Sequence, residues 1–259
     1  MDTAIMNTIE RRHDIVQCTL DSGKVLIPDL VDKYGVSAVT IRSDLNNLHS
    51  KGLLIRTRGG AVASNKITQE LSINDKYNEH SEVKRKLALV ASNLIDEEDA
   101  IILDSGTTTA EIANCLDRFK QLIVMTNGLN VAQNLVNADG VEVLMTGGSL
   151  RKKSLSFYGS QAEDSLSRYH FNKVFLGVDG FDLNVGVTTH FEAECVLNRK
   201  MCEVAREVIV VTDSSKFNTL GVHKILGLKE IDVLITDEGI QDEFIQSLEA
   251  NGVRVIIAD

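Results

Sequence analysis

The chain has 259 residues, and its fractions of hydrophobic (43%) and charged (25%) residues are those of an ordinary soluble globular protein. No apolar run approaches the roughly 20 residues of a transmembrane helix, and the N-terminus lacks a signal-peptide pattern, so we expect a cytoplasmic protein without a membrane partner. The four cysteines lie far apart and form no cluster with histidines, which favours reduced thiols over a metal site. We expect no cofactor.

The net charge of −10 is distributed unevenly along the chain. Residues 1–62 hold eight Lys/Arg against seven Asp/Glu, whereas the remaining residues hold 19 against 30. The acidity therefore belongs to the larger, C-terminal part of the chain. A DNA-binding domain can be close to neutral overall if its positive groups share one face, so the net charge does not exclude a nucleic-acid partner.

The pattern of residues 1–62 predicts a winged helix-turn-helix domain. An amphipathic first helix is followed by Pro28, which favours the start of a short second helix, and by Gly35, which suits its end. Ser37 then caps a third helix over residues 38–49. Two helices joined by a short turn that contains glycine form the helix-turn-helix of many DNA-binding proteins. A plain helical bundle with solvated arginines is the alternative.

The third helix and the hairpin after it carry the predicted DNA contacts. Ile41, Leu45 and Leu48 recur at helical spacing and face the core, which turns the small and hydrogen-bonding side chains outward, as docking in the major groove requires. Residues 53–62 predict a hairpin with a basic, glycine-rich tip, a wing that can lie along phosphates. The residues predicted to contact DNA are Ser37, Ala38, Thr40, Arg42, Ser43, Asn47, Arg56 and Arg58.

The rest of the chain reads as a linker followed by an α/β domain. Residues 63–82 are polar without a clear period, which predicts an interdomain linker. From residue 83 to residue 259, short β-branched runs alternate with helical stretches, which predicts a Rossmann-like parallel sheet covered on both faces (residues 83–259). The predicted strands are residues 100–103, 122–125, 141–145, 174–178, 208–211, 233–235 and 253–257.

Six of these runs end in small polar residues, as in Asp104-Ser105-Gly106. An ordinary turn or helix cap explains any one of them, but ligands of open α/β sheets bind outside the carboxyl ends of the strands, so six together favour a pocket for a small polar ligand. Three threonines follow and present backbone N–H groups and hydroxyls to an anion such as a phosphate ester. The predicted effector-binding residues are Asp104, Ser105, Gly106, Thr107, Thr108, Thr109, Asn127, Gly128, Gly147, Gly148, Arg151, Asp179, His190, Glu194 and Lys216.

The motifs of both parts resemble those of the DeoR family of bacterial transcription regulators. In the first part these are Ser37-x-x-Thr40-Ile41-Arg42-Ser43-Asp44-Leu45 and Arg58-Gly59-Gly60-Ala61, and Ser43 stands where the family usually has Arg or Lys. In the second part they are Asp104-Ser105-Gly106-Thr107-Thr108, Thr126-Asn127-Gly128, Thr146-Gly147-Gly148, Gly177-Val178-Asp179-Gly180 and Asp213-Ser214-Ser215-Lys216-Phe217. The resemblance covers nearly the whole chain.

The resemblance implies a DNA-binding transcriptional repressor of a sugar catabolic operon, which a phosphorylated sugar releases from its operator. It also implies an effector domain related to ribose-5-phosphate isomerase and glucosamine-6-phosphate deaminase, and a homo-oligomer, either a dimer or a tetramer. Residues 145–151, 156–159 and 197–205 are most similar to the subgroup that controls the use of N-acetylgalactosamine and galactosamine. An amino sugar is therefore the expected effector class.

The alternative function is a sugar-phosphate isomerase or deaminase with an attached DNA-binding head. Isomerisation needs a carboxylate base and a cation, and the residues that supply these in principle are Asp179, Asp182, Glu192, Glu194 and Lys216. The pentose-phosphate isomerases carry a Lys-Gly-x-Gly loop after their acidic motif, whereas residues 186–192 contain no lysine. Mainly because of the resemblance to the DeoR regulators, and because this lysine is missing, we predict a sensor without catalytic residues. In it, the carboxylates accept hydrogen bonds and His190 orients the ligand.

Overall fold

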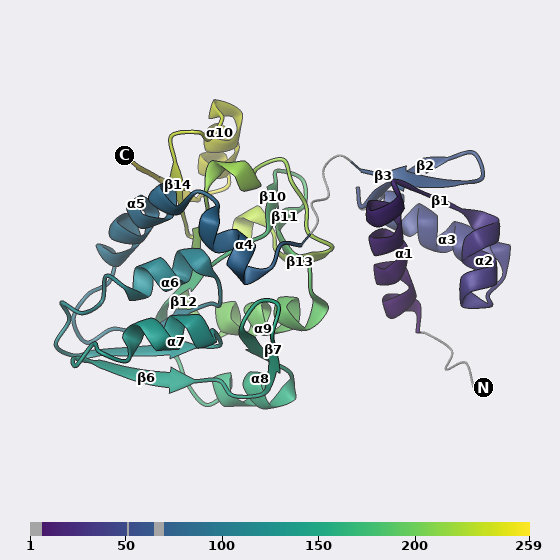
Figure 1. Cartoon of the computed structure of the whole chain (residues 1–259). Coiled ribbons are helices and arrows are strands. Elements are labelled where there is room, and N and C mark those ends of the chain that lie inside the picture. Colours follow the sequence, from purple (N-terminus) through teal and green to yellow (C-terminus); the bar gives the residue numbers. More distant parts are fainter. Residues whose placement is uncertain (1–6, 51, 65–69) are drawn as a thin grey trace.

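The computed structural model describes residues 7–50, 52–64 and 70–259, which form a small N-terminal head (residues 7–64) and a larger α/β body (residues 70–259), both visible in Figure 1. The first residues of the predicted first helix and residues 65–69 of the predicted linker lie outside the described residues. Within the described ranges, no helix is both long and apolar enough to cross a membrane. In the same ranges, no His, Cys, Asp and Glu side chains are grouped so as to hold a metal ion.

The head has the three helices and the hairpin of the predicted winged helix-turn-helix. Its elements are α1 (Thr8–Ser22), β1 (Lys24–Leu26), α2 (Ile27–Tyr34), α3 (Ala38–Ser50), β2 (Leu54–Thr57) and β3 (Gly60–Ala63), and the strand order is β1-β3-β2. Pro28 lies in the first turn of α2, where no N–H is needed, and Gly35 ends that helix in the left-handed conformation. The Ser37 hydroxyl accepts a hydrogen bond from the Thr40 backbone N–H (3.1 Å) and so caps α3.

Strand β1 adds a third strand to the predicted hairpin, and it requires a glycine opposite it. A Cβ atom at Gly60 would lie 1.9 Å from the Val25 carbonyl oxygen, so no larger residue fits there unless the strand moves. The packing of the small sheet therefore accounts for this glycine of the wing without any contact to DNA.

A buried group of charges fixes α1 against α3. The Asp44 carboxylate, which is 1% exposed, accepts the Arg11 Nε at 2.8 Å on one oxygen and the Arg12 Nε at 2.7 Å on the other. Arg11 is itself buried, so water cannot replace Asp44 as the partner of its guanidinium. Since α3 is the predicted recognition helix, this group sets the orientation of that helix in the head.

The body is built on a seven-stranded parallel sheet, and all seven predicted strands belong to it. The strands are β4 (Ala100–Leu103), β5 (Leu122–Thr126), β6 (Val141–Met145), β9 (Phe171–Leu176), β12 (Ala205–Val211), β14 (Val233–Asp237) and β15 (Arg254–Ala258). Their order in the sheet is β15-β14-β12-β9-β4-β5-β6, and every pairing is parallel. The chain therefore extends the sheet from β4 to β6 in one direction and then returns to β9 to extend it in the other.

Helices cover both faces of this sheet, as a parallel sheet requires. Alternate residues of a strand point to opposite faces, so Ile101 and Leu103 pack in one apolar cluster and Ile102 in the other. The helices of the first face are α5 (Ser81–Ser92), α6 (Thr107–Ala113) and α7 (Leu129–Leu135), and those of the second face are α8 (Ser160–Leu166), α9 (Glu192–Glu203) and α10 (Asp242–Ala250) (Figure 1).

Short elements complete the body. They are the hairpin of β7 (Ser149–Arg151) and β8 (Ser156–Tyr158), the antiparallel sheet of β10 (Gly180–Asp182), β11 (Gly186–Thr189) and β13 (His223–Leu226), and the 3-10 helices η1 (Ser214–Lys216) and η2 (Leu228–Glu230). The sheet of β10, β11 and β13 faces the head (Figure 1). Beside it, Leu220 is 2% exposed and packs in the apolar cluster of the head, and the His223 ring stacks on the His13 ring with centroids 5.7 Å apart.

Helix α4 (Ile73–Asn78) lies inside the segment predicted as a linker. Ile73 is buried, and its backbone N–H donates to the Lys153 carbonyl oxygen at 2.9 Å. The Tyr77 hydroxyl accepts a hydrogen bond from the Asn130 side chain at 2.9 Å. The linker prediction missed this helix because α4 has six residues and buries a single side chain, too little for a helical period to be visible in the sequence.

We expect Asp44→Ala to destabilise the head, because it leaves Arg11 buried without its partner. The expected loss is about 3 kcal/mol, the size typical of removing one member of a buried ion pair. Amide hydrogen exchange of α3 measures the loss, since exchange in a core helix reports its opening free energy. The control Glu203→Ala breaks the exposed Lys200–Glu203 pair (3.2 Å) and should change stability by less than about 0.5 kcal/mol. Unchanged exchange of α3 in Asp44→Ala would contradict the role given to this carboxylate.

Candidate functional site

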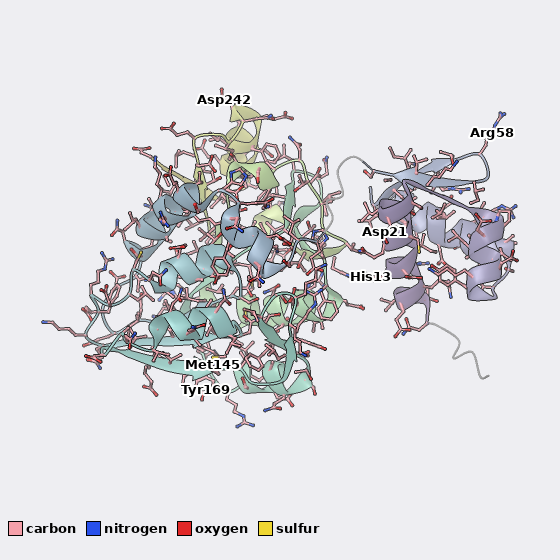
Figure 2. The ribbon with its side chains drawn as sticks, viewed as in Figure 1. His13, Asp21, Arg58, Met145, Tyr169 and Asp242 are labelled. Atoms are coloured by element: carbon pink, nitrogen blue, oxygen red, sulfur yellow. The ribbon has the colours of Figure 1, made fainter. Side chains whose placement is uncertain are left out.

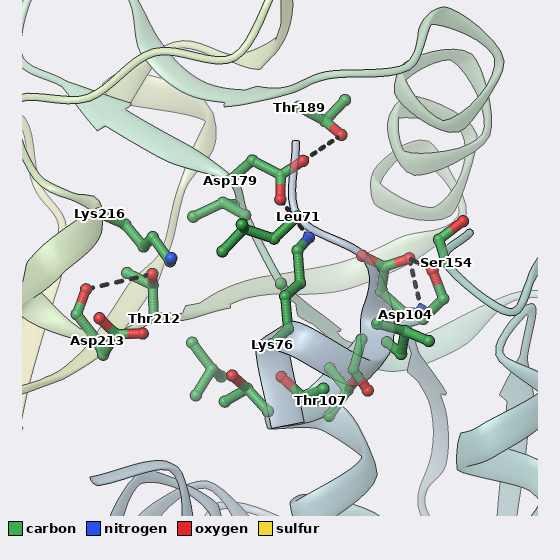
Figure 3. A pocket seen from close by; sticks show the side chains of 18 of the residues that line it. Leu71, Lys76, Asp104, Thr107, Ser154, Asp179, Thr189, Thr212, Asp213 and Lys216 are labelled. Atoms are coloured by element: carbon green, nitrogen blue, oxygen red, sulfur yellow. Dashed lines mark hydrogen bonds and ion pairs between the residues drawn. The ribbon is translucent and has the colours of Figure 1, made fainter. Parts of the chain in front are cut away.

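A cavity lies at the carboxyl ends of β4, β9 and β12, at the point where the strand order reverses (Figure 3). Open parallel sheets bind their ligands at such a point, because the turns after the two central strands diverge and leave a crevice. These turns supply residues 104–109, 177–179 and 211–213. The other wall residues are Ser154, Thr189, Glu194, Asn198, Lys216 and, before or at the start of α5, Glu70, Leu71, Ile73, Lys76, Glu79, His80 and Lys84.

The structure brings together nine of the residues predicted to bind an effector. They are Asp104, Ser105, Gly106, Thr107, Thr108, Thr109, Asp179, Glu194 and Lys216. They come from three strand ends and one helix that are distant in the sequence. For the residues at the strand ends, the prediction rests on the rule that polar strand ends of a parallel sheet meet at one edge, and the cavity is formed in this way.

The other six predicted effector residues are not among those that line the cavity. They are Asn127, Gly128, Gly147, Gly148, Arg151 and His190. The Asn127 Oδ1 accepts the Ser105 backbone N–H at 2.8 Å, and the His190 backbone N–H donates to the Asp179 Oδ2 at 3.2 Å, so both support wall residues. A Cβ atom at Gly148 would lie 2.5 Å from a carbonyl oxygen of β8, so this glycine lets the β7–β8 hairpin close.

Two carboxyl groups, Asp104 and Glu194, form an acidic side of the cavity. Burial, and in addition the nearby Glu194 carboxylate, raises the pKa of Asp104 to about 7. The Ser105 backbone N–H donates to the Asp104 Oδ1 at 2.7 Å. The Glu194 Oε1 accepts hydrogen bonds from the hydroxyls of Ser154 (2.6 Å) and Ser156. The remaining lone pairs of both groups suit the hydroxyl or ammonium groups of a ligand.

An ion pair between Lys76 and Asp179 occupies the middle of the cavity (Figure 3). The Lys76 Nζ lies 2.6 Å from the Asp179 Oδ1, and the Thr189 hydroxyl donates to the Asp179 Oδ2 at 2.9 Å. Burial alone raises the pKa of Asp179, but the Lys76 ammonium, together with His190 and the Thr189 hydroxyl, holds this pKa well below its usual range. Asp179 is therefore a carboxylate at neutral pH, whereas Asp104 is poised to exchange a proton.

Two further lysines, Lys84 and Lys216, give the cavity a cationic side. Lys84 is 6% exposed, and its ammonium donates to the carbonyl oxygens of Lys76 and Glu79. Burial lowers the pKa of Lys84, and although Asp213 acts against this, the charge of Lys216 lowers it too. An anion bound near these ammonium groups would stabilise their charged forms and so raise the pKa of Lys84. The threonine hydroxyls at the start of α6 line the same cavity and add hydrogen-bond donors.

Arg151, a predicted cation of the site, is engaged by Glu70. The guanidinium Nη1 and Nη2 donate to the two carboxylate oxygens of Glu70 in a bidentate pair, with Nη2 and Oε2 2.8 Å apart. The guanidinium also lies over the Phe191 ring, 4.4 Å from its centroid, and its Nη1 is 3.6 Å from the Glu194 Oε1. Burial raises the pKa of Glu70, but the hydrogen bonds and charges of Arg151 and Lys153 together lower it overall. Arg151 therefore holds Glu70, a carboxylate of the cavity wall, in place.

The sequence reading missed the wall residues that precede β4. Lys76 and Glu70 belong to the segment that the sequence predicts as a linker, and no pattern there indicates a site. Lys84 did leave a signal, because it shares the buried face of α5 with Leu87 and Ala91. A lysine on the apolar face of an amphipathic helix is unusual, since an ammonium is rarely buried without a partner. That position alone identifies Lys84 as a candidate for anion binding.

The predicted DNA contacts lie on α3 and on the β2–β3 turn. Arg42 is exposed on α3, and Figure 2 shows Arg58 at the tip of the wing with its side chain directed away from the head. Arg56 differs, because its guanidinium donates to the Gly60 carbonyl oxygen (2.7 Å) and to the Asn46 side chain (3.1 Å), which joins the wing to α3. Ser37 and Ser43 are exposed, and Ala38, Thr40 and Asn47 are half-buried.

Comparison with known proteins gives matches to both parts of the chain. Residues 11–67 match the DeoR-like helix-turn-helix domain, and residues 79–238 match the DeoR C terminal sensor domain. The chain is 50% identical to the "Putative aga operon transcriptional repressor" of Escherichia coli O157:H7, over 98% of this chain and 95% of that protein. It is 35% identical to the HTH-type transcriptional repressor GlcR of Bacillus subtilis (strain 168), over 96% of each protein. Ribose 5-phosphate isomerase A of Methanocaldococcus jannaschii, a solved structure, matches 54% of this chain and 55% of its own with 15% identity and a TM-score of 0.40.

We expect Asp104→Asn to change how stability depends on pH. Because burial raises the pKa of this carboxyl from 3.8 to about 7, the folded protein holds a proton that the unfolded chain releases, so stability falls as the pH rises from about 4 to about 7. The variant lacks this titration and should gain on the order of 4 kcal/mol in stability relative to the parent protein over that interval. Thermal unfolding from pH 4.5 to pH 8 measures the difference, with the exposed Asp164→Asn as control. Parallel stability curves for Asp104→Asn and the parent protein would contradict the shifted pKa.

Proposed function

The chain belongs to the DeoR family of transcriptional regulators, and we propose that it represses a sugar operon and leaves its operator when a phosphorylated sugar binds. Both relatives named above are described as transcriptional repressors, and they align with nearly the whole chain. The sensor-domain match includes the turns that form the cavity. We therefore assign the cavity to recognition of an effector and propose no catalytic residues.

The distribution of charge in the cavity is the observation that carries this proposal. Lys84 and Lys216, with the threonines that open α6, suit a phosphate group. Asp104, Glu194 and Asp179 suit the hydroxyl groups of a sugar, and a carboxylate also suits an ammonium group. In Figure 3, Lys216 and Asp104 lie on different sides of Lys76. A small ligand with an anionic end and a polar end fits such a site.

An amino sugar phosphate is the effector class that we favour. Residues 145–151, 156–159 and 197–205 resemble the subgroup that controls N-acetylgalactosamine and galactosamine use. The relative with 50% identity is named for an aga operon. The carboxyl groups of Asp104, Asp179 and Glu194 in the cavity wall also provide the partners that an ammonium group needs.

For the head, we propose that residues 1–62 bind double-stranded operator DNA with α3 in the major groove and the wing along the backbone. The contacts are those predicted from the sequence, with Arg56 acting mainly by holding the wing on α3. One helix-turn-helix reads few base pairs, so two heads on paired half-sites are needed. The proposed protein is accordingly a cytoplasmic homo-oligomer, a dimer or a tetramer, whose effector domains (residues 83–259 together with residues 70–82) control the two heads.

We expect Arg42→Ala and Arg58→Ala each to weaken operator binding about 10-fold or more, the loss typical of one base or phosphate contact. Arg58→Ala should also reduce the dependence of binding on salt, because a phosphate contact releases a counterion. Fluorescence anisotropy with an operator selected from genomic DNA measures both effects. Arg206→Ala, an exposed arginine of the body, is the control. Both variants should bind sugar phosphates as the parent protein does, and an equal loss in that assay would count against two separate sites.

We expect a sugar phosphate to raise the melting temperature in a concentration-dependent way, because it binds the folded state alone. The screen compares galactosamine 6-phosphate, N-acetylgalactosamine 6-phosphate, glucosamine 6-phosphate and fructose and tagatose phosphates. Lys216→Ala should weaken the hit about 10-fold or more through loss of a charge-assisted hydrogen bond. Lys229→Ala, an exposed lysine outside the cavity, should not. A hit that is converted to product during incubation would instead mean an enzyme, and a screen without any hit would contradict the proposed effector class.

A further inference from the structure

Residues 70–80 (the strap) join the head to the body and also form part of the cavity wall. The strap follows residues 65–69, which link it to the head in the sequence, and it ends where α5 begins. Its wall residues are Glu70, Leu71, Ile73, Lys76, Glu79 and His80. A ligand in the cavity is therefore in contact with the segment through which the head is attached.

Two ion pairs hold the strap on the body. At its start, Glu70 meets the Arg151 guanidinium as a fork and also lies 3.2 Å from the Lys153 Nζ. In α4, the Lys76 ammonium lies 2.6 Å from the Asp179 carboxylate. All of these side chains except that of Lys153 are at most about one-quarter exposed, so the two pairs are partly desolvated and stronger than surface pairs.

The Lys76 ammonium shows what kind of group Asp179 accepts. It enters from the strap, reaches the middle of the cavity, and takes one carboxylate oxygen, while the Thr189 hydroxyl and the His190 backbone N–H take the other (Figure 3). An ammonium group of a ligand placed at the same oxygen would make the same interaction. The carboxylate cannot hold both ammonium groups at that position, because their charges repel and their volumes overlap.

We propose that Lys76 is an internal competitor for the ammonium group of an amino sugar phosphate, and that the ligand releases the strap by replacing Lys76 on Asp179. This inference rests on the proposed function, and it adds a chemical class and a means of regulation to it. The ligand phosphate stays with Lys84 and Lys216, and its ammonium takes Asp179. The released strap then loses the ion pair in α4 and keeps the Glu70–Arg151 pair at its start, so the segment through which the head is attached is held less firmly on the body.

This exchange explains how one small ligand could act on the head. A ligand shifts an equilibrium only by its differential affinity for the two states. With the strap in place, Asp179 is occupied, and with the strap released, it is available. A ligand with an ammonium group therefore favours the released state, whereas a neutral N-acetyl analogue cannot replace the charge of Lys76.

The test uses the full chain with Lys76→Met, which removes the ammonium and keeps the length of the side chain. Calorimetric titration with galactosamine 6-phosphate and with N-acetylgalactosamine 6-phosphate compares a cationic with a neutral ligand. We expect Lys76→Met to bind galactosamine 6-phosphate about 10-fold or more tightly than the parent protein, as for a charge-assisted contact that no longer has a competitor. Its affinity for the N-acetyl compound should change by less than about 3-fold. Lys86→Met, an exposed lysine of α5, is the matched control.

Two further measurements hold even if Lys76→Met folds poorly. Glu70→Gln loosens the other end of the strap without altering Asp179, and it should raise the affinity for galactosamine 6-phosphate by making release easier. In the parent protein, galactosamine 6-phosphate should speed amide exchange of residues 73–76, whose bonds include Ile73 N–H to the Lys153 carbonyl oxygen.

The outcomes separate this inference from the proposed function. Weaker binding of both sugar phosphates by Lys76→Met would make Lys76 a ligand contact, and slower exchange of the strap with ligand would make it a closing lid; either result overturns the competitor role and leaves the sensor intact. Binding of neither compound by any of the proteins overturns the proposed effector class, and the competitor role with it.

Discussion

The parallel pairing of β4 with β9 is the constraint on which the functional site depends. The chain leaves β4 toward β5 and β6 on one side and returns to β9 on the other, so the turns after the two strands diverge and leave a crevice. This crevice brings Asp104 and Asp179 together although they are far apart in the sequence. Asn127, which follows β5, keeps the first turn open by accepting the Ser105 backbone N–H. The cavity is thus a consequence of strand order, and the side chains at the strand ends give it its chemistry.

Burial makes the charged groups of this crevice depend on one another, because an ion with few water contacts is stable only beside an opposite charge or after a proton transfer. Asp179 is stabilised by an opposite charge, the Lys76 ammonium at 2.6 Å. Asp104, which is buried beside Glu194, instead binds a proton more readily, with a pKa raised to about 7. Lys84 relies on backbone carbonyl oxygens and on Asp213. The affinity of a charged ligand is therefore a difference between the pairs that it forms and the pairs that it breaks.

The sequence predicts the parts of this structure that follow from local pattern. Seven apolar runs become the seven parallel strands, and Pro28, Gly35 and Ser37 mark the helix-turn-helix, because burial on two faces and helix capping each leave a short-range signature. The position of the strap cannot be predicted in this way. Lys76 pairs with Asp179, which is distant in the sequence, and no local pattern near either residue indicates that ion pair. Arg151 is recognisable as a cation, but its partner in the predicted linker is not.

Two connections lead from Asp179 to the head, and they differ in kind. One is covalent, since Lys76 belongs to the strap that precedes α5 and follows the head. The other connection runs through hydrogen bonds and packing. The Thr189 hydroxyl on β11 donates to the Asp179 carboxylate (2.9 Å). The hydroxyl of the preceding residue, Thr188, accepts the Gly221 backbone N–H (2.7 Å). Leu220, the residue before Gly221, is buried in the apolar cluster of the head. A change in what Asp179 binds therefore acts at the point where both connections meet, which is the arrangement that coupling between two sites requires.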